Sequence, residues 1–316
     1  MIRPVARRAL ASGRLPFGAR QRLQWRRDHG QWRAGHPATF TGKVRWKMLK
    51  DRRALLTRFA DKAAARDYVA GVVGPEYLAQ EYGRFADADA LRRASLPREF
   101  VAKVTHGCGG IWLVSDDAPR GGRIVWGERH VPGPKSLTSG WHRVFTRPDE
   151  IAWESIAAAF SAWLRWNYAD VSLEWAYLKI RPRILVEELL RGSGGASPPD
   201  YKLFVFEDRV RLVQVDTNRH GDHRRNLYLP DWTPLDVEYV YRRGAEVPRP
   251  ASLEEMIRVA EVLGQDVDFV RVDLYEVAGR VVFGELTNYP EAGSGSFDPP
   301  SFDEELGAWW HLPARY

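Results

Sequence analysis

The sequence predicts an α+β fold in which the second half of the chain forms a mainly antiparallel sheet. Two observations lead to this prediction. Short apolar runs separated by turn residues fill the second half, and helical patterns do not alternate regularly with strands as they do in a doubly wound sheet. The chain has 316 residues, of which 44% are hydrophobic and 28% charged. This length allows one large domain or two to three lobes, and the composition is that of a globular protein.

The first half of the chain combines helices with a strand, a glycine loop and a second strand. Residues 61–74 predict a helix, because an aspartate suits its first turn and a Gly-Pro pair ends it. The run 100–105 is typical of a buried strand with one lysine near its end; the glycine loop 106–110 and a second strand over 111–115 follow. Residues 150–168 are rich in tryptophan at helical spacing, and we interpret these side chains as core.

The second half is predicted to consist mostly of strands. An apolar strand over 183–190 contains two adjacent carboxylates, and a loop rich in glycine, serine and proline follows over 192–199. The remaining elements are a hairpin of YKLFVF and VRLVQVD around Glu207-Asp208, a helix over 253–263, and the strands FVRVDLYEV and VVFGELTNYP joined at Ala278-Gly279.

Composition excludes several classes of protein. The single cysteine, Cys108, rules out an intramolecular disulfide and any cysteine-based zinc or iron–sulfur site. No uncharged apolar run approaches the roughly 18 to 20 residues that span a bilayer, and the first residues carry no apolar targeting segment. We therefore expect a cytoplasmic protein.

Positive charge is concentrated near the N-terminus. Residues 1–58 hold 16 Lys and Arg but only two acids, whereas the remainder of the chain carries an excess of eight acids. Such a segment either contacts an anionic partner (nucleic acid, a membrane face or an acidic polymer) or is simply a solvated helical extension. Its large aromatic residues predict packing against the rest of the protein: Phe17, Trp25, Trp32, Phe40 and Trp46.

Two carboxylates on neighbouring predicted strands are the strongest chemical signal. Asp273 and Glu285 flank a tight turn, so both can face one side of a sheet and converge. Mg²⁺ typically binds one or two protein carboxylates together with phosphate oxygens, and Asn288 offers a neutral oxygen nearby. Arg271 and Lys202 would offset the charge of a nucleotide's phosphates. The alternative is an ordinary polar face of a hairpin.

The glycine loop is a weaker signal. Gly107, Gly109 and Gly110 permit the close backbone approach that phosphate-binding loops use, and Lys103 places a cation just before them. As a hairpin turn, however, the loop needs no ligand. The sequence contains no Walker A motif and no Gly-x-Gly-x-x-Gly between a strand and a helix, which disfavours ordinary P-loop and Rossmann folds.

A charged stretch after the first hairpin has two interpretations. His220 and His223 have the spacing of metal ligands, but in TNRHGDHRRN a polar loop is the simpler interpretation. Together with Arg219, Arg224 and Arg225, these histidines are candidates for contact with an anionic substrate. We do not interpret Cys108 as a nucleophile, because no group that would orient a base beside it is evident.

Taken in order, these motifs resemble the ATP-grasp superfamily, and within it the TupA-like branch, named for a teichuronopeptide biosynthesis protein. The resembling phrases, spread over roughly residues 55–310, are DKAAARDYV, FVAKVTHGCGG, PRILVEELL, DYKLFVF, RVDLY and GELTNYP. The resemblance implies two α+β lobes that grip ATP; the basic N-terminal helical extension expected over residues 1–55 lies outside the better-matching region. The resemblance also implies an N-terminal and central lobe over 56–186 that contains the glycine loop, and a C-terminal lobe over 187–316 that contains the metal site.

The resemblance also implies roles for individual residues. Lys62 or Arg66, together with Lys103 and Lys202, would hold the ATP phosphates beneath a flexible lid at Gly107–Gly110. Glu187 and Glu188 would lie at the adenine hinge, with one of them or Asp200 accepting from the ribose hydroxyls. Asp273 and Glu285 would bind Mg²⁺, and Arg271 with Lys202 would stabilise the transferring phosphoryl group. Many relatives have Glu-x-Asn at the second metal strand, whereas this chain has Glu285-Leu-Thr-Asn288, so the third ligand is either Thr287 or Asn288.

The implied activity is an ATP- and Mg²⁺-dependent carboxylate–amine ligase that forms an amide or peptide bond through an acylphosphate. The expected partners are small-molecule or polymer substrates bearing a carboxylate and an amine, such as a sugar acid or peptide in cell-envelope, polysaccharide or secondary metabolism. No specific nucleic acid is expected, and the oligomeric state is left open. The alternatives are an ATP-grasp phosphotransferase and a polyanion-binding protein. Much of residues 20–55 should be ordered against the body and serve the substrate end of the cleft.

Overall fold

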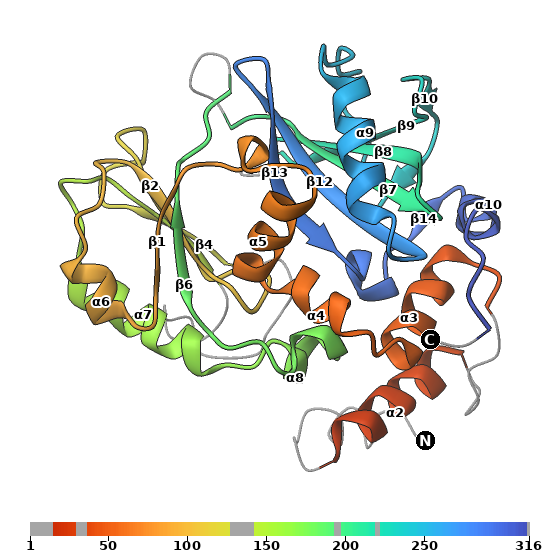
Figure 1. Ribbon diagram of the computed structural model, residues 1–316, viewed down its shortest axis with the longest axis horizontal. Helices are drawn as coiled ribbons and strands as arrows, with labels where there is room; N and C mark the ends of the chain where they lie inside the picture. Colours follow the sequence, from red (N-terminus) through yellow and green to blue (C-terminus); the bar gives the residue numbers. More distant parts are fainter. Residues whose placement is uncertain (1–14, 30–36, 127–141, 193–196, 219–221, 315–316) are drawn as a thin grey trace.

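Two six-stranded sheets lie side by side in the computed structural model, which describes residues 15–29, 37–126, 142–192, 197–218 and 222–314 (Figure 1). The first sheet has the order β1-β6-β2-β3-β5-β4 and is antiparallel except for the parallel pair β3–β5. Its strands are β1 (Glu81–Phe85), β2 (Phe100–Val104), β3 (Ile111–Val114), β4 (Arg123–Trp126), β5 (His142–Thr146) and β6 (Ile184–Glu187). The strand–loop–strand unit predicted around the glycine loop is confirmed as β2–β3.

The second sheet is antiparallel throughout, with the order β10-β9-β8-β7-β12-β13. Its strands are β7 (Asp200–Phe206), β8 (Arg209–Thr217), β9 (Arg224–Tyr228), β10 (Pro234–Leu235), β12 (Phe269–Val277) and β13 (Arg280–Thr287). A separate short pair joins β11 (Glu238–Tyr239) to β14 (Phe297–Asp298). The mainly antiparallel second sheet predicted from the sequence is therefore confirmed.

A tight turn connects the two strands in each of the predicted hairpins. Glu207 and Asp208, with φ of 50° and 64°, join β7 to β8, and Ala278 and Gly279, with φ of 50° and 76°, join β12 to β13. Two successive residues with positive φ are characteristic of the type I′ turn, whose twist matches that of the flanking strands. These local turns fix the register of β12 against β13, and thereby the position of the two candidate metal carboxylates.

Helices cover the first sheet with aromatic residues. The helices α6 (Ala88–Arg93) and α7 (Trp153–Arg165) pack against each other and the sheet (Figure 1). Trp112 of β3 and Phe160 and Trp163 of α7 are fully buried in this core. The core role predicted for the aromatic residues of this helix is confirmed for Phe160 and Trp163, although the helix begins at Trp153, later than predicted.

The two faces of the second sheet differ. The helix α9 (Leu253–Gly264) covers one face with Met256, Val259 and Leu263. The opposite face is apolar at one end, where β7 and β12 carry Phe204 and Phe269. That end is covered by the N-terminal part of the chain and by the segment after α10 (Ser301–Ala308). The other end of this face carries charged side chains.

The basic N-terminal part forms α2 (Phe17–His29) and α3 (Phe40–Lys50). Phe40 is fully buried, and its ring lies 5.3 Å from that of Phe269 and 5.8 Å from that of Phe204. Packing is confirmed for Trp25, Phe40 and Trp46, which are at most 5% exposed; Phe17 is half-buried, and Trp32 lies outside the described residues. Within the described residues, α3 is thus part of the core of the second sheet.

The helices α4 (Ala54–Ala60) and α5 (Lys62–Val72) run between the two sheets (Figure 1). The predicted start of α5 is confirmed, since the Asp61 side chain accepts a hydrogen bond from the Ala63 N–H. The backbone N–H of Lys62 donates to the Thr105 carbonyl beside the glycine loop, while Phe59 packs in the core of the second sheet. The helices α4 and α5 therefore contact both lobes. The division of the chain into three parts at residues 55 and 186 stays a prediction.

The remaining short elements complete the chain: η1 (Pro75–Tyr77), α8 (Ala169–Ser172), η2 (Trp175–Tyr177) and η4 (Pro290–Gly293). Among the helices of the described residues, none combines the length and the apolar character needed to cross a membrane.

Candidate active site

A row of charged side chains crosses the middle of the second sheet. Asp273 on β12 lies directly opposite Glu285 on β13 and, on its other side, directly opposite Lys202 on β7. Residues opposite one another in neighbouring strands project from the same face of a sheet. The predicted convergence of Asp273 and Glu285, with Arg271 and Lys202 nearby, is confirmed by this register and by the contacts of Asp273.

Asp273 is buried between two cations. Its Oδ1 lies 2.7 Å from Arg271 Nε, and its Oδ2 lies 2.8 Å from Arg271 Nη2 and 2.6 Å from Lys202 Nζ. Lys202 also donates to Asp200 Oδ2 at 2.6 Å, so its ammonium bridges two carboxylates that are each at most 4% exposed. Burial lowers the pKa of Arg271, but the charges of Asp273, Glu285 and Asp200 outweigh this effect and raise it.

Glu285 has a different environment. Its side chain is 34% exposed, and its Oε1 accepts a hydrogen bond from Lys62 Nζ at 3.2 Å. Burial raises the pKa of Glu285, yet the charges of Lys62, Arg271 and Lys202 outweigh burial and lower the pKa to about 2. For Lys62 the same two effects act in the opposite directions. Burial lowers the pKa of Lys62, but Glu285 and its other neighbours outweigh burial and raise the pKa overall. Both groups are therefore charged at neutral pH.

The glycine loop adjoins this ion pair. Lys62 Nζ also donates to the Gly107 carbonyl at 2.8 Å, so one ammonium contacts both the loop of the first sheet and a strand of the second. Gly109 and Gly110 have φ of 105° and 64°, a region that side chains other than hydrogen rarely allow. The loop thus has backbone dihedrals that favour glycine at Gly109 and Gly110, whereas its close approach to a phosphate and its role as a lid stay predictions.

A small cleft lies between α5, the first sheet and β13. Lys62, Arg66, Lys103, Glu187 and Glu285, all predicted from the sequence, line it together with apolar residues. The lining therefore includes candidates for phosphate and metal binding from both lobes, as a nucleotide site between two sheets requires.

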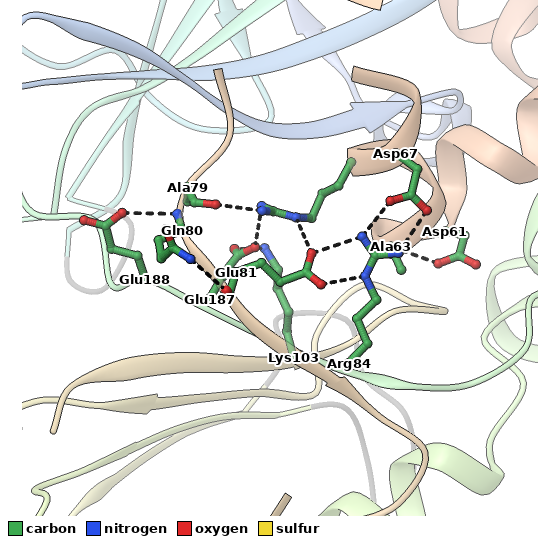
Figure 2. Close-up of polar contacts among 11 residues, drawn as sticks. Asp61, Ala63, Asp67, Ala79, Gln80, Glu81, Arg84, Lys103, Glu187 and Glu188 are labelled. Atoms are coloured by element: carbon green, nitrogen blue, oxygen red, sulfur yellow. Dashed lines mark hydrogen bonds and ion pairs between the residues drawn. The ribbon is translucent and has the colours of Figure 1, made fainter. Parts of the chain in front are cut away.

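Inside this cleft the cations are paired with acids, as Figure 2 shows for Lys103 and Glu187. Arg66 donates to the second oxygen of Glu187 at 3.1 Å and to Glu81 at 3.1 Å. Glu81 in turn accepts from Arg84, which also binds Asp67 (Figure 2). The network joins α5 to β1, β2 and β6, so the position of Glu187 is fixed by cations on two other elements.

Glu188 lies just outside the network. Its backbone N–H donates to the Gln80 carbonyl at 2.9 Å, and its side chain accepts from the Gln80 N–H at 3.3 Å (Figure 2). The adenine-hinge role of Glu187 and Glu188 and the ribose role of Asp200 remain predictions. In this structure, Asp200 holds Lys202 and Glu187 holds Lys103 and Arg66.

The donor set fits a magnesium ion that is shared with phosphates. Within the described ranges, no three His, Cys, Asp or Glu residues are grouped as metal ligands. The candidate ligands for the ion are therefore the two opposed carboxylates, Asp273 and Glu285, together with neutral oxygens nearby. Thr287 shares the face of Glu285 and accepts from Arg271 at 3.0 Å, whereas Asn288 donates to the Leu56 carbonyl and leaves its buried Oδ1 without a hydrogen bond. Such a hard, all-oxygen set with few carboxylates is what Mg²⁺ bound to a nucleotide requires.

The predicted substrate residues are only partly described. Arg219 and His220 lie outside the described residues. His223 stacks on Tyr241, with ring centroids 3.8 Å apart, and its Nε2 lies 3.6 Å from Asp216. Arg224 pairs with Asp222 at 2.7 Å on the surface. Contact of these residues with a substrate stays a prediction.

Two polar positions of β8, Gln214 and Asp216, were not predicted from the sequence. Asp216 and Arg225 form a buried ion pair at 2.7 Å, and Gln214, fully buried, donates to Asp216. Burial raises the pKa of Asp216, but its contacts with His223, Arg225 and Lys202 outweigh burial and hold the pKa well below its usual range. The signal was present in VRLVQVD, because Gln214 and Asp216 alternate with apolar residues and so share the face of Asp200 and Lys202.

Comparisons with solved structures give only distant likenesses. An L-amino acid ligase from Bacillus licheniformis is 12% identical with a TM-score of 0.40, the alignment covering 92% of this chain and 55% of that protein. The ATP-grasp ligase PsnB with its minimal precursor, Mg and ADP is 14% identical with a TM-score of 0.38, covering 90% and 66%. D-alanine–D-alanine ligase from Bacillus anthracis is 10% identical with a TM-score of 0.35, covering 74% and 59%. The chain thus spans between about half and two thirds of the length of these proteins.

The family comparison is more specific. No curated protein matches the sequence. A sequence model of the TupA-like ATP-grasp family, however, matches residues 138–311, which is more than half of the chain and includes β7, β12 and β13 with the charged row. The α+β fold with two sheets and a cleft between them agrees with this match. The chain belongs to the TupA-like ATP-grasp family.

Proposed function

We propose that this protein is an ATP- and Mg²⁺-dependent ligase that joins a carboxylate to an amine. The observation that carries the proposal is the direct opposition of Asp273 and Glu285, with Lys202, Arg271 and Lys62 within hydrogen-bond distance of one or the other. Membership of the ATP-grasp family supports it. The alternating acids and bases suit a site that must hold both a cation and phosphate groups.

In this proposal the cleft residues divide between two tasks. Lys62, Arg66 and Lys103 line the cleft and hold the phosphates, and Lys202 and Arg271 counter the charge that develops on the transferred phosphoryl group. Asp273 and Glu285, with Thr287 or Asn288 as a neutral oxygen, would hold Mg²⁺. When bound, Mg²⁺ neutralises phosphate charge and makes the γ-phosphorus easier to attack.

Two displacements follow one another. A carboxylate oxygen of the first substrate attacks the γ-phosphorus, the bond to the β-phosphate bridging oxygen breaks, and ADP leaves with an acylphosphate formed. The nitrogen of the amine then attacks the acyl carbon, inorganic phosphate leaves, and the amine loses a proton as the C–N bond forms. Because water would hydrolyse the acylphosphate, closure of the 107–110 loop over the cleft serves to exclude it.

The substrates we propose are a sugar acid or a peptide carboxylate and an amino compound, in cell-envelope polysaccharide or secondary metabolism. The family to which the chain belongs supports this setting, since it takes its name from a teichuronopeptide biosynthesis protein. A cytoplasmic location suits an enzyme that consumes ATP.

A screen for ADP release tests the activity. The full chain is incubated with ATP, Mg²⁺ and pairs drawn from a library of carboxylates and amines. Release that needs both members of a pair, with a product mass equal to the pair less one water, supports ligation. Phosphorylated product without an amine would instead show a phosphotransferase.

A further inference from the structure

Lys62 occupies a junction between the two lobes. It is the first residue of α5, and its side chain is 12% exposed. Its ammonium donates to the Gly107 carbonyl at 2.8 Å and to Glu285 Oε1 at 3.2 Å. The same group therefore ties the glycine loop to one of the two opposed carboxylates.

Cations of the protein itself neutralise Asp200, Asp273 and Glu285. Lys202 pairs with Asp200 and Asp273, Arg271 pairs with Asp273, and Lys62 pairs with Glu285. Three carboxylates thus face three cations within hydrogen-bond distance. A divalent cation that approaches this row meets no net negative charge, and an ammonium beside its ligand repels it.

Of the three cations, Lys62 is held least firmly to a carboxylate. Lys202 bridges two buried carboxylates at 2.6 Å each, and Arg271 grips Asp273 with two nitrogens. Among the residues that the structure describes, Lys62 contacts a single carboxylate, one-third exposed, at 3.2 Å, and both residues line the cleft. A lysine side chain has four rotatable bonds, so its ammonium can move to a phosphate without any change in the backbone.

We propose that Lys62 is the counter-ion of Glu285 in the nucleotide-free protein, where it opposes binding of a divalent cation, and that nucleotide phosphates draw Lys62 away and free Glu285. This inference rests on the proposed function, because it takes Glu285 as a ligand of Mg²⁺ and Lys62 as a phosphate contact. Nucleotide and metal then bind with positive coupling, and each raises the affinity for the other by the same factor. The glycine loop is released from Lys62 in the same step, which links loop position to nucleotide binding.

The test measures Mn²⁺ binding to the full chain without nucleotide. Calorimetry, or the electron paramagnetic resonance signal of free Mn²⁺, gives the affinity. Lys62→Met removes the ammonium but keeps most of the side-chain volume, and Lys62→Arg keeps the charge. Lys103→Met is the matched control, because Lys103 lines the same cleft but pairs with Glu187. Thermal unfolding of each variant shows that it is folded.

Lys62→Met should bind Mn²⁺ at least about tenfold more tightly than the wild type, which corresponds to about 1.4 kcal/mol. Lys62→Arg and Lys103→Met should bind like the wild type, and adding Glu285→Gln to Lys62→Met should remove the gain. The analogue AMPPNP should raise the Mn²⁺ affinity of the wild type more than that of Lys62→Met.

Two failures are distinguishable. If AMPPNP promotes Mn²⁺ binding to the wild type but folded Lys62→Met binds free Mn²⁺ no more tightly, the counter-ion role of Lys62 is wrong and the proposed function stands. If Mn²⁺ does not bind the wild type even with AMPPNP, the proposed function is wrong and this inference falls with it.

Discussion

Glu285 lies directly opposite Asp273 across β12 and β13, yet the two carboxylates differ in burial and in partners. Asp273 is 4% exposed and paired with two cations, whereas Glu285 is 34% exposed and, within the described part of the chain, paired with one cation, Lys62. The same conservative change should therefore have different consequences at the two positions.

Glu285→Gln should leave the fold intact and reduce ATP turnover by at least about 100-fold, because it removes one proposed ligand of Mg²⁺. Asp273→Asn should reduce turnover as well, but it should also lower the free energy of unfolding by about 3–5 kcal/mol, since it deprives buried Arg271 and Lys202 of a charged partner. ADP release and urea unfolding check the two effects. Glu305→Gln, at an exposed position of α10, serves as the control. Wild-type turnover in Glu285→Gln would contradict the metal assignment.

Lys103→Ala should weaken nucleotide binding by about 1.5–3 kcal/mol, the usual range for a hydrogen bond to a charged group. Lys103 lines the cleft, and its present partner Glu187 is also held by Arg66, so the acid does not lose its only cation. Calorimetry with AMPPNP gives the affinity. Arg92→Ala, which breaks a surface pair with Glu154, should not change it. Equal affinities in wild type and Lys103→Ala would return Lys103 to a structural role.

Phe40→Ala should lower the free energy of unfolding by about 3–5 kcal/mol, because a fully buried ring leaves a cavity that its neighbours fill only partly. The rings of Phe204, Phe269 and Trp310 surround it. Urea unfolding measures the loss, and Val171→Ala, at a position 56% exposed, should cost about 0.5 kcal/mol or less. A stable protein lacking residues 1–50 would show that α3 is only an appendage.

Asp216→Asn should destabilise the protein most at pH 7 and less in acid. The folded pKa of Asp216 is lowered relative to an unfolded value of about 3.9, so its contribution to stability is fully present above that value and is lost as the pH falls below it. At pH 7 the change removes the closer carboxylate partner of buried Arg225 and leaves Glu291 at 3.6 Å, at a cost of about 3 kcal/mol. Urea unfolding at pH 7 and near pH 3 should show the gap between variant and wild type narrowing by about 1 kcal/mol, because the unfolded chain takes up the proton before folded Asp216 does. The exposed Asp222→Asn is the control, and a gap that is the same at both pH values would exclude this account.

Local signals made part of the fold and site predictable. The turns at Glu207-Asp208 and Ala278-Gly279 are short, so the order of residues alone placed β7 beside β8 and Asp273 opposite Glu285. The start of α5 at Lys62 was predictable for the same reason, since its cap at Asp61 is adjacent in sequence.

Long-range relationships were not predictable. The parallel pairing of β3 with β5 and the position of β1 beside β6 join distant segments, and β1 carries too few apolar residues to stand out as a strand. Glu81 was missed with it. The contact of Lys62 with Glu285 joins residues more than 200 positions apart, and no local pattern indicates it. Phe40 was recognised as a packing residue, but its place in the core of the second sheet depends on the full tertiary fold.

The most direct test of the central claim uses a productive substrate pair labelled with ¹⁸O in both carboxylate oxygens. After ATP-dependent turnover by the wild type, mass spectrometry of inorganic phosphate and of the ligated product follows the label. If the carboxylate attacks the γ-phosphorus and an amine then displaces phosphate, one ¹⁸O appears in the phosphate and one stays in the amide. Phosphate without label, or a ligated product that keeps both labelled oxygens, would contradict ligation through an acylphosphate at this site.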